Sequence, residues 1–397
     1  MHPSARLVRV LYLQPGAMFG GAERQAATSI PLLPSFGIEV IPLVGPGQAV
    51  VDWLVERGVD NSVFSQDFPG AWKKPRGIAR LFQPWRYCRC YWALQRTIHR
   101  LAIEESIDLV YAALPFSWVV ATPVARRLRL PVIWRAGGTE VSEWQARALN
   151  AYARFRPPDL LVCCGEAVKR VYGAFVPAPT LVVRSGVDTA QFHPDAGDPT
   201  AFRPRSSEVV VGFAARLVRE KRPEDFLAMA ARLAHHHGVS FLVAGEGSLR
   251  AAYENMAREL GCAANVRFLG YVADMRSFYA SCDVFVLSSR SEGCPNVVLE
   301  AMAMRRALVV SDAAGTTEVI AHDKEGLIYK MGDVDALARA VQCMISSAER
   351  RRMLADNGYR HVVSDYSAQA HAARLAELFR KYSQSAAASL SEMPGIA

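Results

Sequence analysis

The chain has 397 residues, of which 51% are hydrophobic and 21% are charged, and its formal net charge is +8. A chain of this length exceeds the size at which one hydrophobic core stops growing, so two domains are expected. The composition excludes a disordered or fibrous protein. The positive charge favours attraction to a polyanion, such as a phosphorylated ligand, an anionic lipid or a nucleic acid.

The sequence predicts a soluble, cytoplasmic protein. The apolar stretch Leu7–Leu13 is shorter than the hydrophobic region of a secretory signal. The uncharged stretch Leu109–Ala125 contains Pro115 and Pro123 and falls short of spanning length, which favours strand, turn and helix. Eight cysteines are scattered without the spacing of disulfides or of a zinc site, which predicts reduced thiols.

Short apolar strands alternate with helices along the first half of the chain. Strands are predicted at Val8–Leu13, Glu39–Val44, Asn61–Ser65, Asp108–Ala112, Pro131–Arg135, Asp159–Cys163 and Thr180–Arg184. Helices are predicted at Ala22–Leu33, Trp85–Glu105, Trp118–Leu128 and Glu140–Ala153. Because the strands are apolar throughout rather than at alternate positions, both of their faces should be covered, as in a parallel, doubly wound sheet.

A stretch rich in Pro, Asp, Gly and Ser, Asp188–Ser207, predicts the interdomain linker, and the alternation then resumes. Strands are predicted at Val209–Ala214, Ser240–Ala244, Val266–Leu269, Val284–Leu287, Leu308–Val310 and Gly326–Ile328. Helices are predicted at Pro223–His236, Ser248–Leu260, Met275–Ser281, Asn296–Met304 and Val334–Ser346, with a final helix at Ala368–Tyr382. The small, polar tail from Ser383 is expected to be disordered.

These elements predict an α/β fold of two Rossmann-like domains, each a doubly wound parallel sheet, that face a central cleft. Ligands are expected in the cleft at the carboxyl ends of the strands. The expected boundaries are residues 1–187 and 188–366 for the two domains, 367–384 for a helix that packs back toward the first domain, and 385–397 for the tail.

The strongest functional signal is the segment SSRSEGCPNVVLEAMA, residues 288–303, between a strand and a helix. A helix that begins near Pro295 or Asn296 presents free N–H groups and the positive end of its dipole to an anion. Glu292 precedes this helix, and Glu300 lies about one turn inside it. Carboxylates would repel a phosphate, so they are expected to accept hydrogen bonds from a sugar and a ribose. An exposed loop glutamate and a helical glutamate are the alternative interpretation.

The spacing of Glu292 and Glu300, E-x7-E, resembles the signature of family 4 glycosyltransferases. Three further segments resemble that family in order and spacing: GGAERQ at residues 20–25, RSGVDTAQFHP at 184–194 and AARLVREKRPEDFL at 214–227. The resemblance covers most of the chain and implies a GT-B fold. It also implies retaining transfer of a sugar from a nucleotide diphosphate sugar, most commonly a UDP-sugar, without a metal or another cofactor.

The resemblance implies that the first domain binds the acceptor and the second the donor. Arg216 and Lys221 would hold the leaving diphosphate and Glu292 would orient the donor sugar, as the catalytic residues. The other implied donor-binding residues are Gly20, Gly21, Gly245, Gly293, Cys294, Pro295, Asn296, Val297 and Glu300. Taken alone, Arg216 and Lys221 would more often be solvated cations, and the glycines could equally mark structural turns.

The chain departs from the family pattern at several positions. Many relatives have a histidine after the strand that Pro131–Arg135 represents, whereas this chain reads RAGGTE at residues 135–140. Arg135 and Glu140 are therefore the acceptor-side candidates, and no general base is assigned. The other departures are Ser185 in place of Asn, Arg305-Arg306-Ala307 in place of Gly-x-Pro, and Thr316 in place of the second glycine of a turn.

Two patterns that could suggest a metal have simpler interpretations. Asp333-Val334-Asp335 precedes an amphipathic helix, which favours N-capping. His235-His236-His237 ends a predicted helix just before Gly238, where solvated or cationic side chains are favourable. No metal site is expected.

Between Trp72 and Arg100, eight Lys and Arg residues interleave with six aromatic residues, and no acidic residue occurs from Phe68 to Ile103. This stretch suits peripheral contact with an anionic membrane, which would be the inner face of the cytoplasmic membrane. An ordinary helix that packs its aromatic residues on the sheet is the other open interpretation. Nothing else supports a nucleic-acid partner.

Membrane contact would favour a lipid-linked glycan acceptor in cell-surface polysaccharide assembly, whereas a soluble acceptor remains open. Two other functions also remain open. One is a different GT-B enzyme, a sugar-nucleotide epimerase or a phosphorylase. The other is a non-catalytic scaffold subunit with a glycosyltransferase-like fold.

Overall fold

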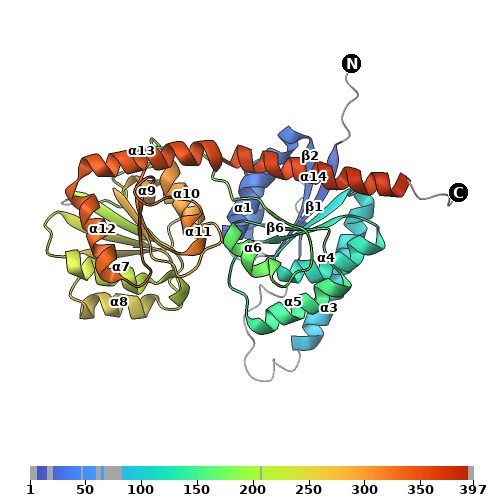
Figure 1. The fold of residues 1–397 in the computed structure, drawn as a ribbon, viewed down its shortest axis with the longest axis horizontal. Helices are drawn as coiled ribbons and strands as arrows, with labels where there is room; N and C mark the ends of the chain where they lie inside the picture. The colour runs from blue at the N-terminus through green and yellow to red at the C-terminus, as the bar shows by residue number, and fades with distance from the viewer. Residues whose placement is uncertain are drawn as a thin grey trace, which may run out of the picture. The chain divides into compact units, whose positions relative to one another are not determined.

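The computed structural model describes residues 7–15, 21–45, 48–59, 64–66, 83–205 and 208–391. The chain forms two compact units (Figure 1). Unit 1 comprises Met1–Gly186 together with Ala368–Ala397, and unit 2 comprises Val187–Ser367. Each unit is built around a parallel sheet with helices on both faces, which confirms the predicted fold class.

Unit 1 contains a seven-stranded parallel sheet in the order β3-β2-β1-β4-β5-β6-β7. The strands are β1 Val8–Gln14, β2 Ile38–Val44, β3 Phe64–Ser65, β4 Leu109–Ala113, β5 Val132–Ala136, β6 Leu160–Cys163 and β7 Thr180–Val182. The helices are α1 Gly21–Ser29, the 3-10 helix η1 Ile30–Phe36, α2 Gln48–Val55, α3 Gln83–Glu104, α4 Pro115–Arg127, α5 Glu143–Phe155, α6 Glu166–Gly173 and α14 Ala368–Ser391.

The two faces of this sheet are covered by different helices. On one face, α1, η1 and α14 pack over side chains such as Tyr12 and Tyr111, and the ring of Phe379 lies 5.2 Å from that of Tyr111. On the other face, Trp118 of α4 stacks on Trp134 of β5 at 4.9 Å. Burial on both faces explains why the strands are predominantly apolar and do not alternate with polar residues.

Two predicted helices end differently in the structure. The helix expected at Ala22–Leu33 is α-helical only to Ser29 and then becomes 3-10, because Pro31 and Pro34 lack the N–H donors that an α-helix needs. The last helix does not end near Tyr382 but continues to Ser391, so the disorder expected from Ser383 was wrong for that stretch. Its alanines have the highest helix propensity, and no Pro or Gly occurs before Pro394.

Unit 2 contains a six-stranded parallel sheet in the order β10-β9-β8-β11-β12-β13. The strands are β8 Val209–Ala214, β9 Val239–Ala244, β10 Val266–Gly270, β11 Val284–Leu287, β12 Ala307–Ser311 and β13 Leu327–Tyr329. The helices are the 3-10 helix η4 Arg219–Lys221, α7 Pro223–Leu233, α8 Arg250–Glu259, α9 Met275–Ala280, α10 Asn296–Ala303, α11 Ala314–Thr317, α12 Val334–Ser346 and α13 Ala348–Asp365.

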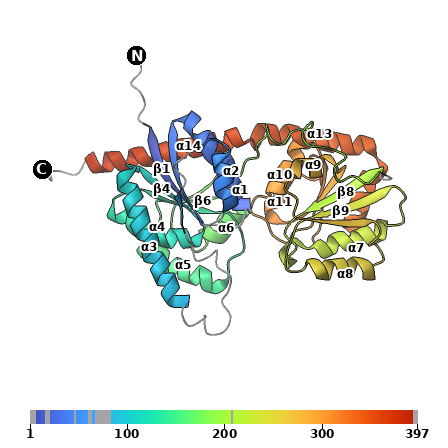
Figure 2. The ribbon, with the colours of Figure 1, turned by 180° about the vertical axis from the view of Figure 1, so that it is seen from behind.

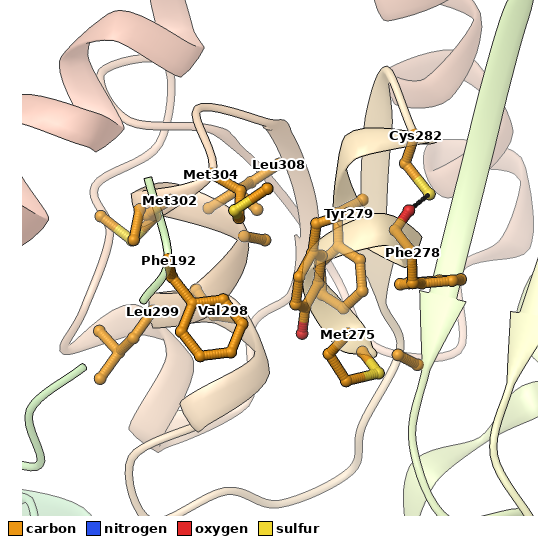
Figure 3. Close-up of a cluster of buried hydrophobic side chains, with 14 of the residues drawn as sticks. Phe192, Met275, Phe278, Tyr279, Cys282, Val298, Leu299, Met302, Met304 and Leu308 are labelled. Carbon is orange, nitrogen blue, oxygen red and sulfur yellow. Dashed lines mark hydrogen bonds between the residues drawn. The ribbon is translucent and has the colours of Figure 1, made fainter. Parts of the chain in front are cut away.

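The stretch expected to be a linker, Asp188–Ser207, packs on unit 2 instead wherever the structure describes it. Phe192 lies in a buried cluster with Tyr279 and side chains of α10 (Figure 3). The backbone N–H groups of Asp198 and Phe202 donate to the Ser277 and Ser281 hydroxyls at 2.8 and 3.2 Å. A segment rich in turn residues can be ordered when its few apolar side chains reach a core.

No helix in the described part of the chain combines the length and the apolar character needed to cross a membrane. Leu109–Ala125 forms β4 and α4, as the prolines predicted. The cysteines of the described residues are all free thiols.

Candidate functional site

The predicted donor-site residues that belong to unit 2 follow the carboxyl ends of its strands. The strand order reverses between β8 and β11, and ligands of doubly wound sheets bind at such a switch point. Arg216 and Lys221 follow β8, Gly245 follows β9, and the segment with Glu292 follows β11. Parallel strands end at the same edge of a sheet, so residues distant in sequence meet there.

Lys221 and Glu292 form an ion pair at this edge. The Lys221 Nζ donates to Glu292 Oε1 at 2.7 Å, and both side chains are largely buried, with 19% and 12% of their surface exposed. Their loops are joined as well: the Ser288 hydroxyl donates to the Lys221 carbonyl at 3.1 Å, and the Arg290 N–H donates to the Glu220 carbonyl at 2.8 Å. The loops after β8 and β11 therefore hold a cation and a carboxylate together.

Helix α10 begins at Asn296, with Pro295 as its N-cap residue, as the sequence predicted. The first N–H groups of a helix have no acceptor within it and can bind an anion. Glu300 lies inside α10 and is buried, and the Tyr279 hydroxyl donates to its Oε2 at 2.8 Å. Tyr279 thus fixes the orientation of the Glu300 carboxylate.

Two glycines bring the loops of this site into direct backbone contact. Gly245 has a φ of 135°, and a Cβ there would collide with the Ala215 carbonyl, next to Arg216. A Cβ on Gly315 would collide with the carbonyls of Glu292 and Gly293. The structure therefore supplies a packing reason for both glycines, which does not depend on a bound ligand.

Arg216 is exposed and makes no ion pair with any residue that the structure describes. Two hydroxyls of the loops at this edge, of Ser289 after β11 and of Thr316 in α11, are buried and have no hydrogen-bond partner within the described structure. Buried hydroxyls are usually hydrogen-bonded, so unpartnered ones beside a ligand site are candidates for contacts with that ligand. No local pattern in the sequence distinguishes Ser289 from the serines beside it.

In unit 1, the predicted residues do not form one cluster. Gly20 lies outside the described residues, and Gly21 is the first residue of α1. Arg135 is buried near the carboxyl end of β5, whereas Glu140 is exposed in the loop that precedes α5. The Arg135 Nη1 has no hydrogen-bond partner among the residues that the structure describes, although a buried guanidinium N–H normally has one.

A buried polar cluster at the start of α1 escaped the sequence analysis. The Gln14 Nε2 donates to Glu23 Oε1 at 3.0 Å, and the Gly186 N–H donates to Gln25 Oε1 at 3.1 Å. The GGAERQ segment contained two of these residues, but only its glycines were singled out. Contacts with Gln14 and Gly186 could not be seen from local sequence.

His371 of α14 is also buried in unit 1. Its Nδ1 lies 2.7 Å from the Arg184 carbonyl, an acceptor, so this nitrogen carries the proton. Burial is the main cause that lowers the pKa of His371 to about 4; the hydrogen bond to the Arg184 carbonyl opposes this shift, and the positive charges of Arg135 and Arg374 add to it. His371 is therefore neutral at neutral pH and adds no second positive charge near Arg135.

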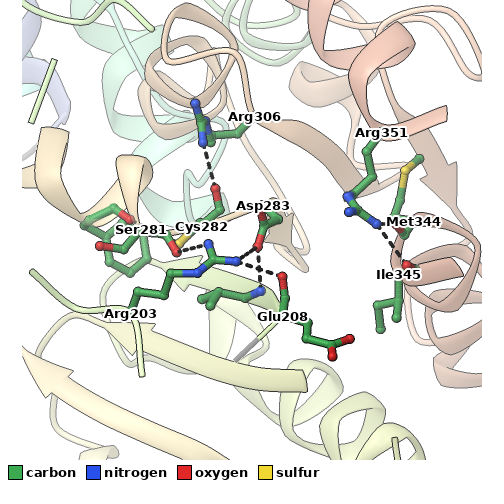
Figure 4. A network of polar contacts seen from close by, with 11 residues as sticks. Arg203, Glu208, Ser281, Cys282, Asp283, Arg306, Met344, Ile345 and Arg351 are labelled. Atoms are coloured by element: carbon green, nitrogen blue, oxygen red, sulfur yellow. Dashed lines mark hydrogen bonds and ion pairs between the residues drawn. The ribbon is translucent and has the colours of Figure 1, made fainter. Parts of the chain in front are cut away.

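The substitution at Arg305–Ala307 has a structural explanation. Arg305 has a φ of 57°, a left-handed conformation that favours glycine, and its guanidinium pairs with Asp356 of α13. The half-buried Arg306 donates to the Cys282 carbonyl at 3.0 Å, beside the Arg203–Asp283 ion pair (Figure 4). The left-handed conformation strains any residue other than glycine, and these contacts offset part of that strain at Arg305.

Of the two patterns that could suggest a metal, the aspartate pattern caps a helix as predicted, whereas the three histidines lie in the turn after α7, which ends at Leu233. The Asp333 carboxylate accepts from the Ala336 N–H at 2.8 Å and caps α12. Among the described residues, no group of three or more His, Cys, Asp or Glu side chains could hold a metal ion.

Two family models match the chain in sequence. The model of "Glycosyltransferase Family 4" matches residues 48–191, and the model of "Glycosyl transferases group 1" matches residues 199–361. The two matches are consecutive and fall largely in unit 1 and in unit 2, respectively.

Two bacterial relatives are similar in sequence. The lipopolysaccharide core biosynthesis glycosyltransferase LpsE of Rhizobium meliloti (strain 1021) is 32% identical over 167 residues, 42% of this chain and 48% of that protein. The lipopolysaccharide core biosynthesis mannosyltransferase LpcC of Rhizobium leguminosarum bv. viciae is 30% identical over 217 residues, 52% of this chain and 61% of that protein. The chain therefore spans less than two thirds of either relative.

Among solved structures, that of Anabaena HepE in complex with UDP and glucose has the same fold. Its TM-score is 0.75, at 21% sequence identity, and the match covers 94% of this chain and 100% of that one.

Proposed function

We propose that this chain, which belongs to the group 1 glycosyltransferases of family 4, moves a sugar from a nucleotide diphosphate sugar to an acceptor with retention of configuration. The observation that carries the proposal is the Lys221–Glu292 pair at the switch point of the unit 2 sheet, close in sequence to the start of α10. A cation, a carboxylate and a helix N-terminus can together bind a phosphate and a sugar hydroxyl.

In the proposed mechanism, the donor's diphosphate binds Lys221, Arg216 and the first N–H groups of α10. Glu292 accepts a hydrogen bond from a hydroxyl of the donor sugar, and Glu300 from the ribose. As the bond between the sugar and the phosphate oxygen breaks, the electron pair leaves with that oxygen. The cations stabilise the charge that develops there, which is typically among the larger catalytic effects. The departing phosphate accepts the proton of the attacking hydroxyl.

We further propose a UDP-sugar as the donor. Support comes from the shared fold of HepE, which was solved with UDP and glucose. The remaining predicted donor residues, Gly20, Gly21, Gly293, Cys294 and Val297, would contribute backbone contacts at the starts of α1 and α10.

The acceptor is proposed to be a glycan, carried by a lipid at the inner face of the cytoplasmic membrane. The names of LpsE and LpcC, which concern lipopolysaccharide core synthesis, support a glycan acceptor. Arg135 and Glu140 remain the acceptor-side candidates. If Arg135 acts on the acceptor, Arg135→Lys should raise the acceptor KM and leave the donor KM unchanged in steady-state kinetics.

A thermal-shift panel of UDP, GDP, ADP and their sugar conjugates tests the donor proposal. A ligand at about 100 times its Kd stabilises the protein by about 2.7 kcal/mol, which is measurable. Stabilisation by one nucleotide class, lost in Lys221→Ala, is expected. Stabilisation by none of them would contradict the proposal. Incubating the donor alone separates an epimerase, which converts the sugar without any acceptor.

A further inference from the structure

Helix α3 carries an exposed stripe of alternating aromatic and basic side chains. Trp85, Arg89, Trp92, Arg96 and Arg100 each follow the previous one by three or four residues, so they share one face of the helix. Trp85 and Trp92 are 61% and 59% exposed, and Arg89, Arg96 and Arg100 are exposed as well. The segment from Trp72 to Phe82, which the sequence analysis grouped with this helix, lies outside the described residues.

The opposite face of α3 is the one that packs on unit 1. Its buried residues are Cys90, Leu94, Ile98 and Leu101, which also recur at three- or four-residue spacing. The exposed tryptophans are therefore not needed to cover the sheet, and the interpretation that α3 packs them on the sheet is wrong. Large exposed aromatic side chains on a helix whose core face is already covered mark an interaction surface.

Helix α5 extends this surface, because it lies beside α3 (Figures 1 and 2). The two helices are close enough for the charge of Arg156, just after α5, to act on Tyr91 of α3. Trp144 and Phe155, at the two ends of α5, are 70% and 87% exposed.

The charge of the surface identifies its partner. Its cations are Arg86, Arg89, Arg96 and Arg100 of α3, Arg147 and Arg154 of α5, and Arg156. The acidic residues of the two helices are Glu104, which pairs with Arg100, and Glu143, which pairs with Arg147. A basic surface with exposed tryptophans matches the boundary between anionic headgroups and acyl chains.

We infer that the exposed faces of α3 and α5, named here the α3–α5 surface, dock unit 1 on an anionic lipid bilayer. The tryptophans and Phe155 enter the headgroup region, and the arginines bind lipid phosphates. This inference deepens the proposed function, because it rests on an acceptor held at a membrane.

Vesicle binding of the full chain tests the inference without requiring sugar transfer. Vesicles of phosphatidylcholine alone and of phosphatidylcholine with phosphatidylglycerol are compared by co-sedimentation at low and high salt. The loss of one arginine near an anionic membrane surface weakens the partitioning of the protein onto the vesicles roughly fivefold. Arg89→Gln with Arg96→Gln should therefore weaken binding roughly 25-fold, and Trp85→Ser with Trp92→Ser, or Trp144→Ser with Phe155→Ser, should also weaken it.

Matched control variants on unit 2 keep the test specific. Arg258→Gln with Arg352→Gln removes the same charge from exposed positions, and Tyr271→Ser removes an exposed aromatic side chain. Both should bind anionic vesicles like the unchanged chain. UDP-induced thermal stabilisation should be unchanged in all variants, which separates failure of docking from failure of donor binding.

Several outcomes would overturn the inference. One is a chain that binds neither vesicle, or both equally. Another is equal weakening by the control arginines, which would mean that net charge alone attracts the lipid. A third is a dimer, detected by ultracentrifugation and disrupted by Trp85→Ser with Trp92→Ser, because the surface would then bind a second copy of the chain. If only the α3 variants weaken binding, the α5 part of the surface is wrong.

Discussion

At the residue scale, the ion pair of Lys221 and Glu292 is expected to contribute both to the stability of the fold and to sugar transfer. Both side chains are largely buried, so removing one leaves the other without its partner in a poorly solvated place. A bound diphosphate would offer Lys221 a second anion, and Glu292 could then bind the sugar.

Glu292→Gln should separate these two roles. The carbonyl oxygen of the substituted side chain can still accept from Lys221, so the free energy of unfolding should fall by no more than about 1 kcal/mol. Sugar transfer should fall by roughly 100-fold or more, because the charged acceptor for the sugar hydroxyl is lost. Lys221→Met should destabilise the chain more and also abolish stabilisation by UDP. Chemical unfolding and initial rates measure these effects, and near-normal transfer by Glu292→Gln would contradict the assignment.

A second residue-scale prediction concerns pH. His371 has a folded-state pKa lowered to about 4, against 6.5 for the free side chain, so the unfolded chain takes up a proton first as the pH falls. The contribution of His371 to the free energy of unfolding is complete above about pH 6.5 and decreases as the pH falls toward 4. At about pH 5 the chain has lost about 2 kcal/mol of this contribution.

His371→Gln should flatten that dependence, because glutamine can donate to the Arg184 carbonyl but does not titrate. All seven tryptophans lie in unit 1, so their fluorescence during urea unfolding at about pH 7 and about pH 5 reports on this unit. Equal acid destabilisation of both proteins would show that His371 is not the titrating group.

At the element scale, short loops joined backbone to backbone position the donor site. Gly315 of α11 lies so close to Glu292 and Gly293 that no side chain fits. The loop after β11 therefore takes its shape partly from α11 and not only from its own sequence.

Gly315→Ala should shift the Glu292 loop and so impair donor binding. The added methyl group overpacks the contact, at a cost of about 1–3 kcal/mol in unfolding free energy, and the UDP thermal shift should shrink. Gly173→Ala is the matched control, because a Cβ there meets no atom within 4 Å. An undiminished UDP shift in Gly315→Ala would mean that the loop tolerates displacement.

At the scale of the whole molecule, unit 1 is discontinuous in sequence and is completed by α14. Phe379 of α14 is fully buried against Tyr111, although the two residues are distant in the chain. Unit 2, from Val187 to Ser367, has its own two buried clusters. Each unit should therefore respond separately to substitutions in its core.

Phe379→Ala should destabilise unit 1 by about 3–5 kcal/mol, because it removes a buried ring and leaves a cavity. Tryptophan fluorescence should report the loss, while the stabilisation by UDP, which depends on unit 2, should persist. Leu181→Ala, at a half-exposed position of β7, is the control and should change little. Loss of the stabilisation by UDP in Phe379→Ala would show that donor binding also depends on an intact unit 1.

Local sequence was sufficient for the strands, the parallel sheets and the start of α10 at Asn296. Each of these depends on neighbouring residues: continuous apolar runs, strand–helix alternation, and a proline before the first turn. It was not sufficient for α13, where Gly358 and many charged residues weaken the helical pattern. There, packing of Leu354 and Val362 on unit 2 stabilises the helix.

Other features depended on residues that are distant in sequence. Lys221 and Glu292 are 71 residues apart, and only the adjacency of β8 and β11 brings them together. The sequence left open whether the aromatic residues of α3 pack on the sheet, and only the neighbouring elements show that Trp85 and Trp92 stay exposed. The burial of Arg135 likewise depends on the elements that surround β5 and not on its own strand. A pattern along the chain reports local preference, whereas pairing, exposure and charge balance arise from contacts between distant segments.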